Sequence, residues 1–158
     1  MPGLSRLARL RPPQPDELAA LSDLCLRSKA WWGYDAAFLA ACLGELTLTP
    51  EELDRDAIIV AELSGRPAGV AQVAVTDREA SLEKLFVEPE AIGEGLGALL
   101  FDWCAAAAAE RGADHMVIES DPGAADFYRR MGARDDGLAP SGSVPGRKLP
   151  RLRLEIGA

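Results

Sequence analysis

The spacing of apolar residues changes once along the chain, near residue 57. Before that point apolar residues recur every three or four positions, which is typical of amphipathic helices. The stripes expected to face the core are Leu18, Leu21, Cys25 and Ser28 in one helix, and Leu39, Cys42, Leu43 and Leu46 in the next. From Ala57 onward, short apolar runs indicate strands. The pattern therefore predicts a helical first third followed mainly by a sheet.

Turn and cap residues supply the boundaries. Asp16 and Asp35 are expected to cap the two helices, and Thr49-Pro-Glu-Glu52 matches a capping box. Ser64-Gly-Arg-Pro67 separates two strands and predicts a hairpin. The expected elements are a strand over 7–11, helices over 16–33 and 35–46, strands over 57–63, 68–75 and 82–87, a helix over 95–111, a strand over 115–119, a helix from 121 to about 131, and strands over 133–138 and 149–156.

Composition narrows the class of protein. A chain of 158 residues, 48% of them apolar, suits a single domain over 1–158. It has no bilayer-length apolar run and no signal-type segment, so we expect a cytoplasmic protein with no membrane partner. The net charge of −8 disfavours nucleic acid as a partner. The three widely spaced cysteines are expected to be buried, and the sole histidine, His115, has no second ligand beside it, so no metal site is predicted.

A glycine-rich turn after a strand is the strongest chemical signal. The strand Leu82 to Val87 leads into Gly93-Glu-Gly95-Leu-Gly97, which opens a long helix. Such a turn presents free backbone N–H groups and the positive end of a helix dipole, both of which bind phosphate. The sequence therefore predicts a phosphate-bearing ligand.

One class of ligand for this turn is a dinucleotide. Gly93-x-Gly95-x-x-Ala98 satisfies that fingerprint formally, and Glu119 ends the next strand where a ribose-binding acid would stand. However, five residues separate Val87 from Gly93, whereas the dinucleotide turn follows its strand directly. Only about 60 residues follow the turn, too few for the usual doubly wound sheet. A dinucleotide site is therefore disfavoured.

The order of elements and two motifs resemble the GNAT superfamily of N-acetyltransferases. The first motif is Ile92-x-x-Gly95-x-Gly97, where the family usually has Gln or Arg in place of Ile92; the second is Asp121-x-x-Ala124-x-x-x-Tyr128, where it usually has Asn in place of Asp121. The resemblance implies an α+β fold with a mostly antiparallel, twisted sheet of six to seven strands. It also implies about four flanking helices, strands splayed around the coenzyme site, and acetyl-CoA as acyl donor.

The resemblance assigns residues to the cosubstrate and to the chemistry. The residues implied to bind acetyl-CoA are Leu85, Phe86, Val87, Gly93, Glu94, Gly95, Leu96, Gly97, Ala98, Asp121, Ala124 and Phe127. Tyr128 falls where the family places its general acid, although a core aromatic is the alternative. Glu83 shares strand parity with Leu85 and Val87, so it is the favoured base, with Glu119 as its rival.

The acceptor side is expected between the first two helices. Cationic and aromatic side chains cluster over 27–34, and they either clamp an acceptor, including one with a carboxylate, or simply end a helix. Arg147 lies in a Gly/Ser/Pro loop that either closes over the acceptor or merely connects two strands. The residues expected to bind the acceptor are Arg27, Lys29, Trp31, Trp32, Tyr34, Glu119 and Arg147.

Three hypotheses about activity follow. The favoured one is acetyl transfer to a primary amine of a small molecule by direct attack in a ternary complex. Acetylation of a protein or peptide amine is the second, and a non-catalytic acyl-CoA-binding module is the third. Relatives often pair, so a homodimer is one expected assembly.

Overall fold

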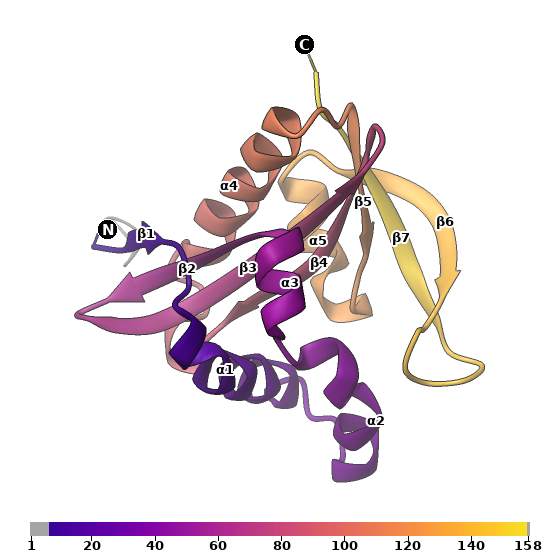
Figure 1. The fold of residues 1–158 in the computed structure, drawn as a ribbon. Helices are drawn as coiled ribbons and strands as arrows, with labels where there is room; N and C mark the ends of the chain where they lie inside the picture. The colour runs from indigo at the N-terminus through magenta and orange to yellow at the C-terminus, as the bar shows by residue number, and fades with distance from the viewer. Residues whose placement is uncertain (1–6, 158) are drawn as a thin grey trace.

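A seven-stranded mixed sheet forms the centre of the molecule in the computed structural model, which describes residues 7–157 (Figure 1). The strands lie in the order β1-β2-β3-β4-β5-β7-β6, and every neighbouring pair is antiparallel except β4 and β5. Their bounds are β1 (Arg9–Arg11), β2 (Ala57–Leu63), β3 (Arg66–Thr76), β4 (Glu79–Val87), β5 (His115–Glu119), β6 (Arg134–Pro140) and β7 (Lys148–Glu155). This is the α+β architecture that the resemblance implies.

Helices cover both faces of this sheet. They are α1 (Leu18–Ala30), α2 (Ala36–Leu46), α3 (Pro50–Arg55), α4 (Leu96–Glu110) and α5 (Ala125–Arg130), with short 3-10 turns η2 (Pro15–Glu17), η3 (Pro89–Ala91) and η4 (Pro122–Ala124). Alternate residues of β2 divide the core between the faces, because Ile59 packs on the α4 side and Val60 on the α1 side. Burying one large aliphatic side chain stabilises the fold by about 1.5–3 kcal/mol, so both helical layers hold the sheet.

The strands β4 and β5 part soon after they begin to pair. Their parallel ladder joins only Glu79–Ser81 to His115–Val117, whereas β4 continues to Val87. A β-bulge lies at the same level, because Lys84 pairs with Gln72 while Leu82 pairs with Val73 and leaves Glu83 without a partner. One edge of β4 is therefore open beyond the bulge.

Several local predictions are confirmed. Asp35 caps α2 by accepting a hydrogen bond from the Phe38 N–H, 2.8 Å away. The β2–β3 turn has left-handed residues at Ser64 and Gly65, as a two-residue hairpin requires. All three cysteines are buried and free. No helix in the described part of the chain is both long and apolar enough to span a membrane.

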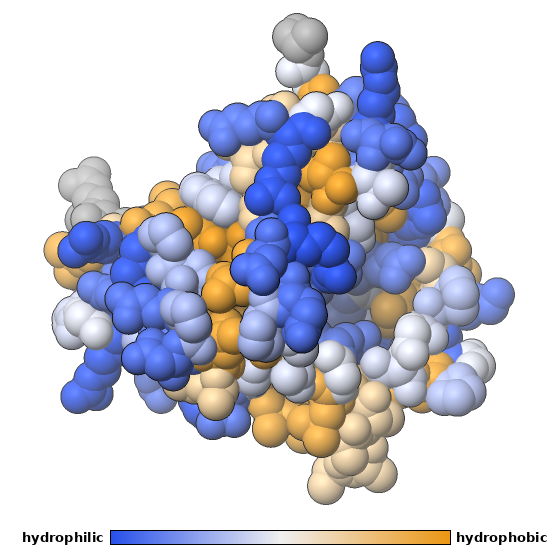
Figure 2. All heavy atoms as spheres, viewed as in Figure 1, coloured by the Kyte–Doolittle hydropathy of each residue, from blue (hydrophilic) through white to orange (hydrophobic). Residues whose placement is uncertain are grey.

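Two local predictions are wrong. Asp16 does not cap a helix, because it lies inside η2, where Glu17 instead accepts the Gln14 N–H. Leu43 does not face the core and is 47% exposed, since the buried side of α2 runs through Cys42 and Leu46. The surface over α2 accordingly shows a group of apolar atoms at the lower edge of the molecule (Figure 2).

Candidate active site

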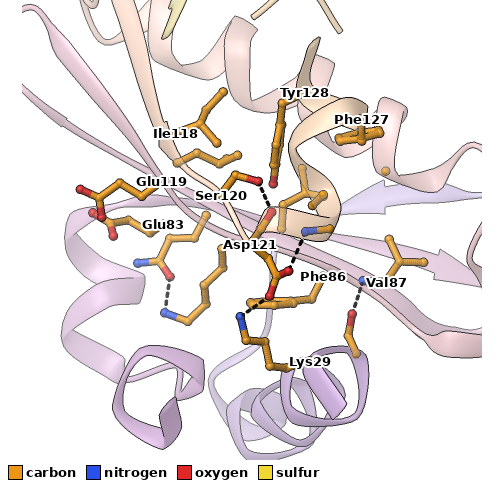
Figure 3. A pocket seen from close by; sticks show the side chains of 18 of the residues that line it. Lys29, Glu83, Phe86, Val87, Ile118, Glu119, Ser120, Asp121, Phe127 and Tyr128 are labelled. Atoms are coloured by element: carbon orange, nitrogen blue, oxygen red, sulfur yellow. Dashed lines mark hydrogen bonds and ion pairs between the residues drawn. The ribbon is translucent and has the colours of Figure 1, made fainter. Parts of the chain in front are cut away.

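A pocket of about 930 Å³ lies where β4 and β5 separate (Figure 3). Its walls come from the end of α1, the open edge of β4, the glycine turn, the end of β5, and η4 with α5. This volume is typical of a site that encloses a cofactor or a drug-sized ligand. Segments from the first and last parts of the chain therefore meet in one cavity.

The glycine turn supplies free donors at one end of this pocket. Gly93 and Gly95 have φ angles of +86° and +90°, and a Cβ atom on Gly93 would meet nothing within 4 Å. Two amides hold the turn itself, those of Ile92 and Glu94, each 3.3 Å from a carbonyl oxygen. The other amides of the turn and of the first residues of α4, those of Gly93, Gly95, Leu96, Gly97 and Ala98, have no acceptor within residues 7–157. They open the 15-residue helix α4, so amides and dipole favour an anion here.

Close packing fixes the position of this turn against α5. A Cβ atom at Gly97 would lie 3.3 Å from the ring of Phe127, tighter than most such contacts. Phe127 in turn packs edge-on against Tyr128, with ring centroids 5.1 Å apart. The start of α4 and the side of α5 are thus held together beside the pocket.

The open edge of β4 presents backbone groups to the same pocket. The Glu88 amide donates to the Ala68 carbonyl oxygen, 2.8 Å away. The backbone N–H and C=O groups of Glu88, and of every second residue before it in β4, therefore face β3. Leu85 and Val87 have the other parity, and their N–H and C=O groups therefore face the edge that β5 has left. The Val87 amide donates to the Ser28 hydroxyl at 3.4 Å, a long hydrogen bond.

Tyr128 lies in this pocket with an unpartnered phenol. Its side chain is 8% exposed and packs on Phe101 at a centroid distance of 5.8 Å. Its hydroxyl points toward the part of the pocket near Ser120 and Asp121 and has no hydrogen-bond partner among the described residues (Figure 3). Burial raises the pKa of Tyr128 above its ordinary value of 10.0, so the phenol keeps its proton at neutral pH.

Asp121 joins three segments of the chain beside Tyr128. It accepts hydrogen bonds from the Gly123 amide at 3.0 Å, the Tyr34 hydroxyl at 2.5 Å and the Lys29 ammonium at 3.0 Å. Arg147 donates to the Tyr34 hydroxyl at 2.9 Å. Burial by itself raises the pKa of Asp121, but the hydrogen bonds from Tyr34, Gly123 and Lys29 outweigh it and lower the pKa. We call Lys29, Tyr34, Asp121 and Arg147 the Asp121 hub.

The residues expected to bind the acceptor have different surroundings. Arg27 pairs with Glu88 at the surface and does not line the pocket, so the structure does not bring it to the site. Tyr34 and Arg147 lie behind the wall, within the Asp121 hub. Trp31 and Trp32 line the pocket and are 52% and 43% exposed, and the Trp32 ring packs on Gly123.

Glu83 and Glu119 reach the pocket from neighbouring strands. Figure 3 shows their carboxylates side by side, and neither forms an ion pair within residues 7–157. Glu83 lines the same pocket as Leu85 and Val87, as strand parity predicts, although a bulge at Glu83 interrupts the alternation between them. Partial burial raises the pKa of the Glu83 carboxyl, and the carboxylates of Asp56 and Glu119 raise it further.

The residues predicted to bind acetyl-CoA fall into two groups, those that line the pocket and those that do not. The predicted cosubstrate residues whose atoms line the pocket are Leu85, Phe86, Val87, Gly93, Gly95, Gly97, Ala98, Asp121, Ala124 and Phe127. Leu96 is only 1% exposed and Glu94 is half-buried, and neither lines the cavity. Leu96 therefore belongs to the core and is not exposed to a ligand in the pocket.

The sequence interpretation missed a buried polar network at the other end of the pocket. Lys84 is 5% exposed and donates to Glu52 and Gln72, both at 2.9 Å. Gln72, only 1% exposed, donates to Asp56 at 2.7 Å, which Arg55 also binds. Adjacent Glu83 and Lys84 in an otherwise apolar strand were the available signal, since two successive polar residues indicate a bulge.

Comparison with known proteins defines the class. A family model described as "Acetyltransferase (GNAT) domain" matches residues 54–132, half of the chain, so the chain belongs to the GNAT acetyltransferase family. The matched segment contains β4, the glycine turn and Tyr128. No curated protein sequence matches significantly.

Solved structures share the fold. A PaiA N-acetyltransferase from Thermoplasma acidophilum in complex with coenzyme A is similar with a TM-score of 0.77 at 16% identity, covering 94% of this chain and 98% of that one. The ribosomal-protein-S18-alanine N-acetyltransferase from Escherichia coli has a TM-score of 0.71 at 18% identity, covering 96% and 95%. An aminoglycoside 6′-N-acetyltransferase complexed with coenzyme A has a TM-score of 0.73 at 16% identity, covering 95% and 98%. At these identities the likeness concerns the fold.

Proposed function

We propose that this acetyltransferase moves the acetyl group of acetyl-CoA to a primary amine of a small molecule. The observation that carries the proposal is one continuous pocket with free glycine-turn amides, the open β4 edge and the unpartnered phenol of Tyr128. The amides would bind a diphosphate, the β4 edge would pair with an extended chain that carries amides, and the phenol would protonate a leaving group.

The described residues fit acetyl-CoA. The free amides of Gly93, Gly95, Gly97 and Ala98, which line the pocket, would hold its diphosphate, and the open space beside Gly93 admits an anion. The N–H and C=O groups of Leu85 and Val87 would pair with the amides of its extended arm, as a neighbouring strand would. Bound there, acetyl-CoA supplies a thioester whose acetyl carbon takes the amine nitrogen as the carbon–sulfur bond breaks and a thiolate leaves.

Tyr128 is the proton donor that the pocket offers to the leaving thiolate. Its phenol is protonated at neutral pH because burial raises its pKa. The same low-polarity surroundings disfavour a thiolate as much as a phenolate, so the proton moves as the thiolate forms. A backbone amide of the open β4 edge would meet the developing oxyanion. The Leu85 amide has no acceptor within residues 7–157, whereas the Val87 amide already donates to the Ser28 hydroxyl.

The acceptor amine must lose a proton before or during attack. An amine with a pKa of about 10.4 costs about 4.6 kcal/mol to deprotonate at pH 7, so a base contributes directly to the rate. We assign this role to Glu83, whose carboxylate lies in the pocket and has a raised pKa that makes it a stronger base. Glu119 remains its rival, since it lies beside Glu83.

The substitution Tyr128→Phe tests this proposal. It removes only the hydroxyl, so we expect kcat to fall by about 10² to 10⁴, the usual contribution of a general acid. Coenzyme A should bind the variant as it binds the parent, measured by calorimetry, because the glycine turn is unchanged. Full activity in Tyr128→Phe with an acceptor that releases the coenzyme thiol contradicts the role of Tyr128.

A protein or peptide acceptor is the second candidate. The observation that favours it is the exposed pair Trp31 and Trp32, whose rings lie 5.1 Å apart at the pocket. A screen of amines beside a screen of peptides with free amino termini or lysines separates the two. A chain that binds acetyl-CoA and accelerates neither reaction is the non-catalytic module. The cytoplasmic location and the homodimer stay predictions.

A further inference from the structure

The cationic side chains around the pocket are largely neutralised by the protein itself. Lys29 pairs with Asp121, Lys84 with Glu52, and Arg55 with Asp56, each with an N–O distance of 3.0 Å or less. The fourth cation on the wall is Arg130, which is exposed on α5. Asp126 lies one helical turn before Arg130 and lines the pocket too. At Lys29 or Lys84 an acceptor with a carboxylate would therefore have to displace a bound carboxylate. Only the exposed Arg130, which has no ion pair within the described residues, would receive it without such a displacement.

The carboxylates of the same pocket are not all neutralised. Six line it, and three of them already have a cation, namely Glu52, Asp121 and Asp126. The other three form no ion pair with any residue of the described chain; these are Glu45, Glu83 and Glu119. The carboxylates of two of these, Glu83 on β4 and Glu119 on β5, lie side by side (Figure 3). Two adjacent carboxylates without a counter-ion repel each other, and a bound cation removes that repulsion.

A second observation in the same pocket points to a ligand. Tyr128 is more than nine-tenths buried, and its hydroxyl points into the cavity without a partner in the described chain. The hydroxyl oxygen itself opens into the cavity and is not among the buried polar atoms of the described residues, so a molecule that enters the cavity can complete its hydrogen bonding. The acidic pair and the phenol therefore belong to one binding cavity.

We propose that the acceptor carries a second positive charge, as a diamine or a longer polyamine does, and that Glu119 binds it. This inference rests on the proposed function and names its substrate class. One amine of the acceptor lies toward Tyr128 and Glu83 and reacts, whereas the other stays protonated beside Glu119. It replaces the expectation that the acceptor carries a carboxylate.

Three primary amines with four carbon atoms each test the charge at the far end of the acceptor. Diaminobutane ends in an ammonium, butylamine in a methyl group and aminobutanoate in a carboxylate. We expect kcat/KM for diaminobutane to exceed that for butylamine by about tenfold, the factor that corresponds to 1.4 kcal/mol. Aminobutanoate should be the poorest, because its carboxylate meets Glu83 and Glu119. Equal rates for all three, or a preference for aminobutanoate, overturn the inference.

A pair of charge-matched variants locates the effect. Glu119→Gln should remove the preference for diaminobutane over butylamine. Glu51→Gln, an exposed residue of α3 outside the pocket wall, makes the same charge change and should keep the preference. If both variants reduce it equally, the preference comes from the overall field of the acidic chain and Glu119 has no such role.

Binding without coenzyme separates this inference from the proposed function. Calorimetry of the unliganded protein should show tighter binding of diaminobutane than of butylamine, and Glu119→Gln should abolish the difference. If coenzyme A binds but none of the three compounds, nor any amine, releases its thiol, the proposed function fails while the binding result still decides the role of Glu119. If diaminobutane binds no better than butylamine, the inference fails whatever the enzyme's activity.

Discussion

The side chain of Glu83 shows how a single residue can be unfavourable for folding and useful for chemistry. Partial burial and the nearby carboxylates of Asp56 and Glu119 raise its pKa above the ordinary value. The folded protein therefore holds this proton more tightly than the unfolded chain does. At a pH below the pKa that Glu83 has in the unfolded chain, its contribution to the free energy of unfolding is fully present. This contribution is lost as the pH rises through the pKa that Glu83 has in the folded protein. At neutral pH the ionised Glu83 is a cost to the fold.

The substitution Glu83→Gln should accordingly separate stability from activity. We expect a higher free energy of unfolding in urea at pH 7 than in the parent, with the difference vanishing at a pH below about 4, where the parent carboxyl is protonated in both states. The rate constant kcat/KM should fall by about 10² to 10⁴ and lose the acidic limb of its pH profile, which in the parent lies above the ordinary pKa of glutamate. An unchanged acidic limb in Glu83→Gln, and its loss in Glu119→Gln, assigns the base to Glu119 instead.

Whole strands and helices follow from the sequence more readily than the contacts between them. The strand β5 lies where it was predicted, and α4 begins and ends within one residue of its prediction, because hydrophobic period and glycine punctuation are local. The bulge at Glu83 and the exposure of Leu43 depend on neighbouring elements. The ion pair between Lys29 and Asp121 joins residues 92 positions apart, and no local pattern encodes such a pairing. The sequence thus predicted a glycine turn and Tyr128 for the site but not the hub behind them.

The Asp121 hub connects the α1–α2 turn, η4 and the β6–β7 loop, so a change there acts on all three. Asp121→Asn keeps an oxygen for the Gly123 amide but removes the charge that binds Lys29 and the Tyr34 hydroxyl. We expect a loss of about 1.5–3 kcal/mol in the free energy of unfolding, the usual value of a hydrogen bond to a charged group. Chemical denaturation measures this loss.

A matched control for the hub lies five residues further along. Asp126→Asn makes the same change at a carboxylate that is 78% exposed and pairs with Arg129 on the surface of α5. Surface pairs of this type contribute about 0.2–1 kcal/mol, so its effect on stability should be the smaller of the two. Equal effects of the two substitutions mean that the hub does not hold the three segments together.

For the molecule as a whole, the net charge of −8 opposes any polyanionic ligand. The glycine turn adds no cation of its own, since Ile92 and Glu94 stand at its start. Affinity for coenzyme A then depends on backbone amides and on the dipole of α4, which act only at contact range. We infer that binding is limited by the repulsion between the acidic protein and the phosphates.

The substitution Ile92→Arg tests this inference by adding charge where there is room for it. Ile92 is 39% exposed at the pocket, so a guanidinium can reach a phosphate without disturbing the core. We expect the Kd for coenzyme A to fall by about fivefold to tenfold in dilute buffer, the equivalent of about 1–1.4 kcal/mol. The thermal midpoint at a fixed coenzyme concentration should rise in parallel. In concentrated salt the gain should shrink, because screening weakens charge pairs but not amide contacts, whereas Ile92→Gln should bring little gain in either buffer. A gain that salt leaves untouched would instead come from the shape of the new side chain, and the acidic field would not limit binding.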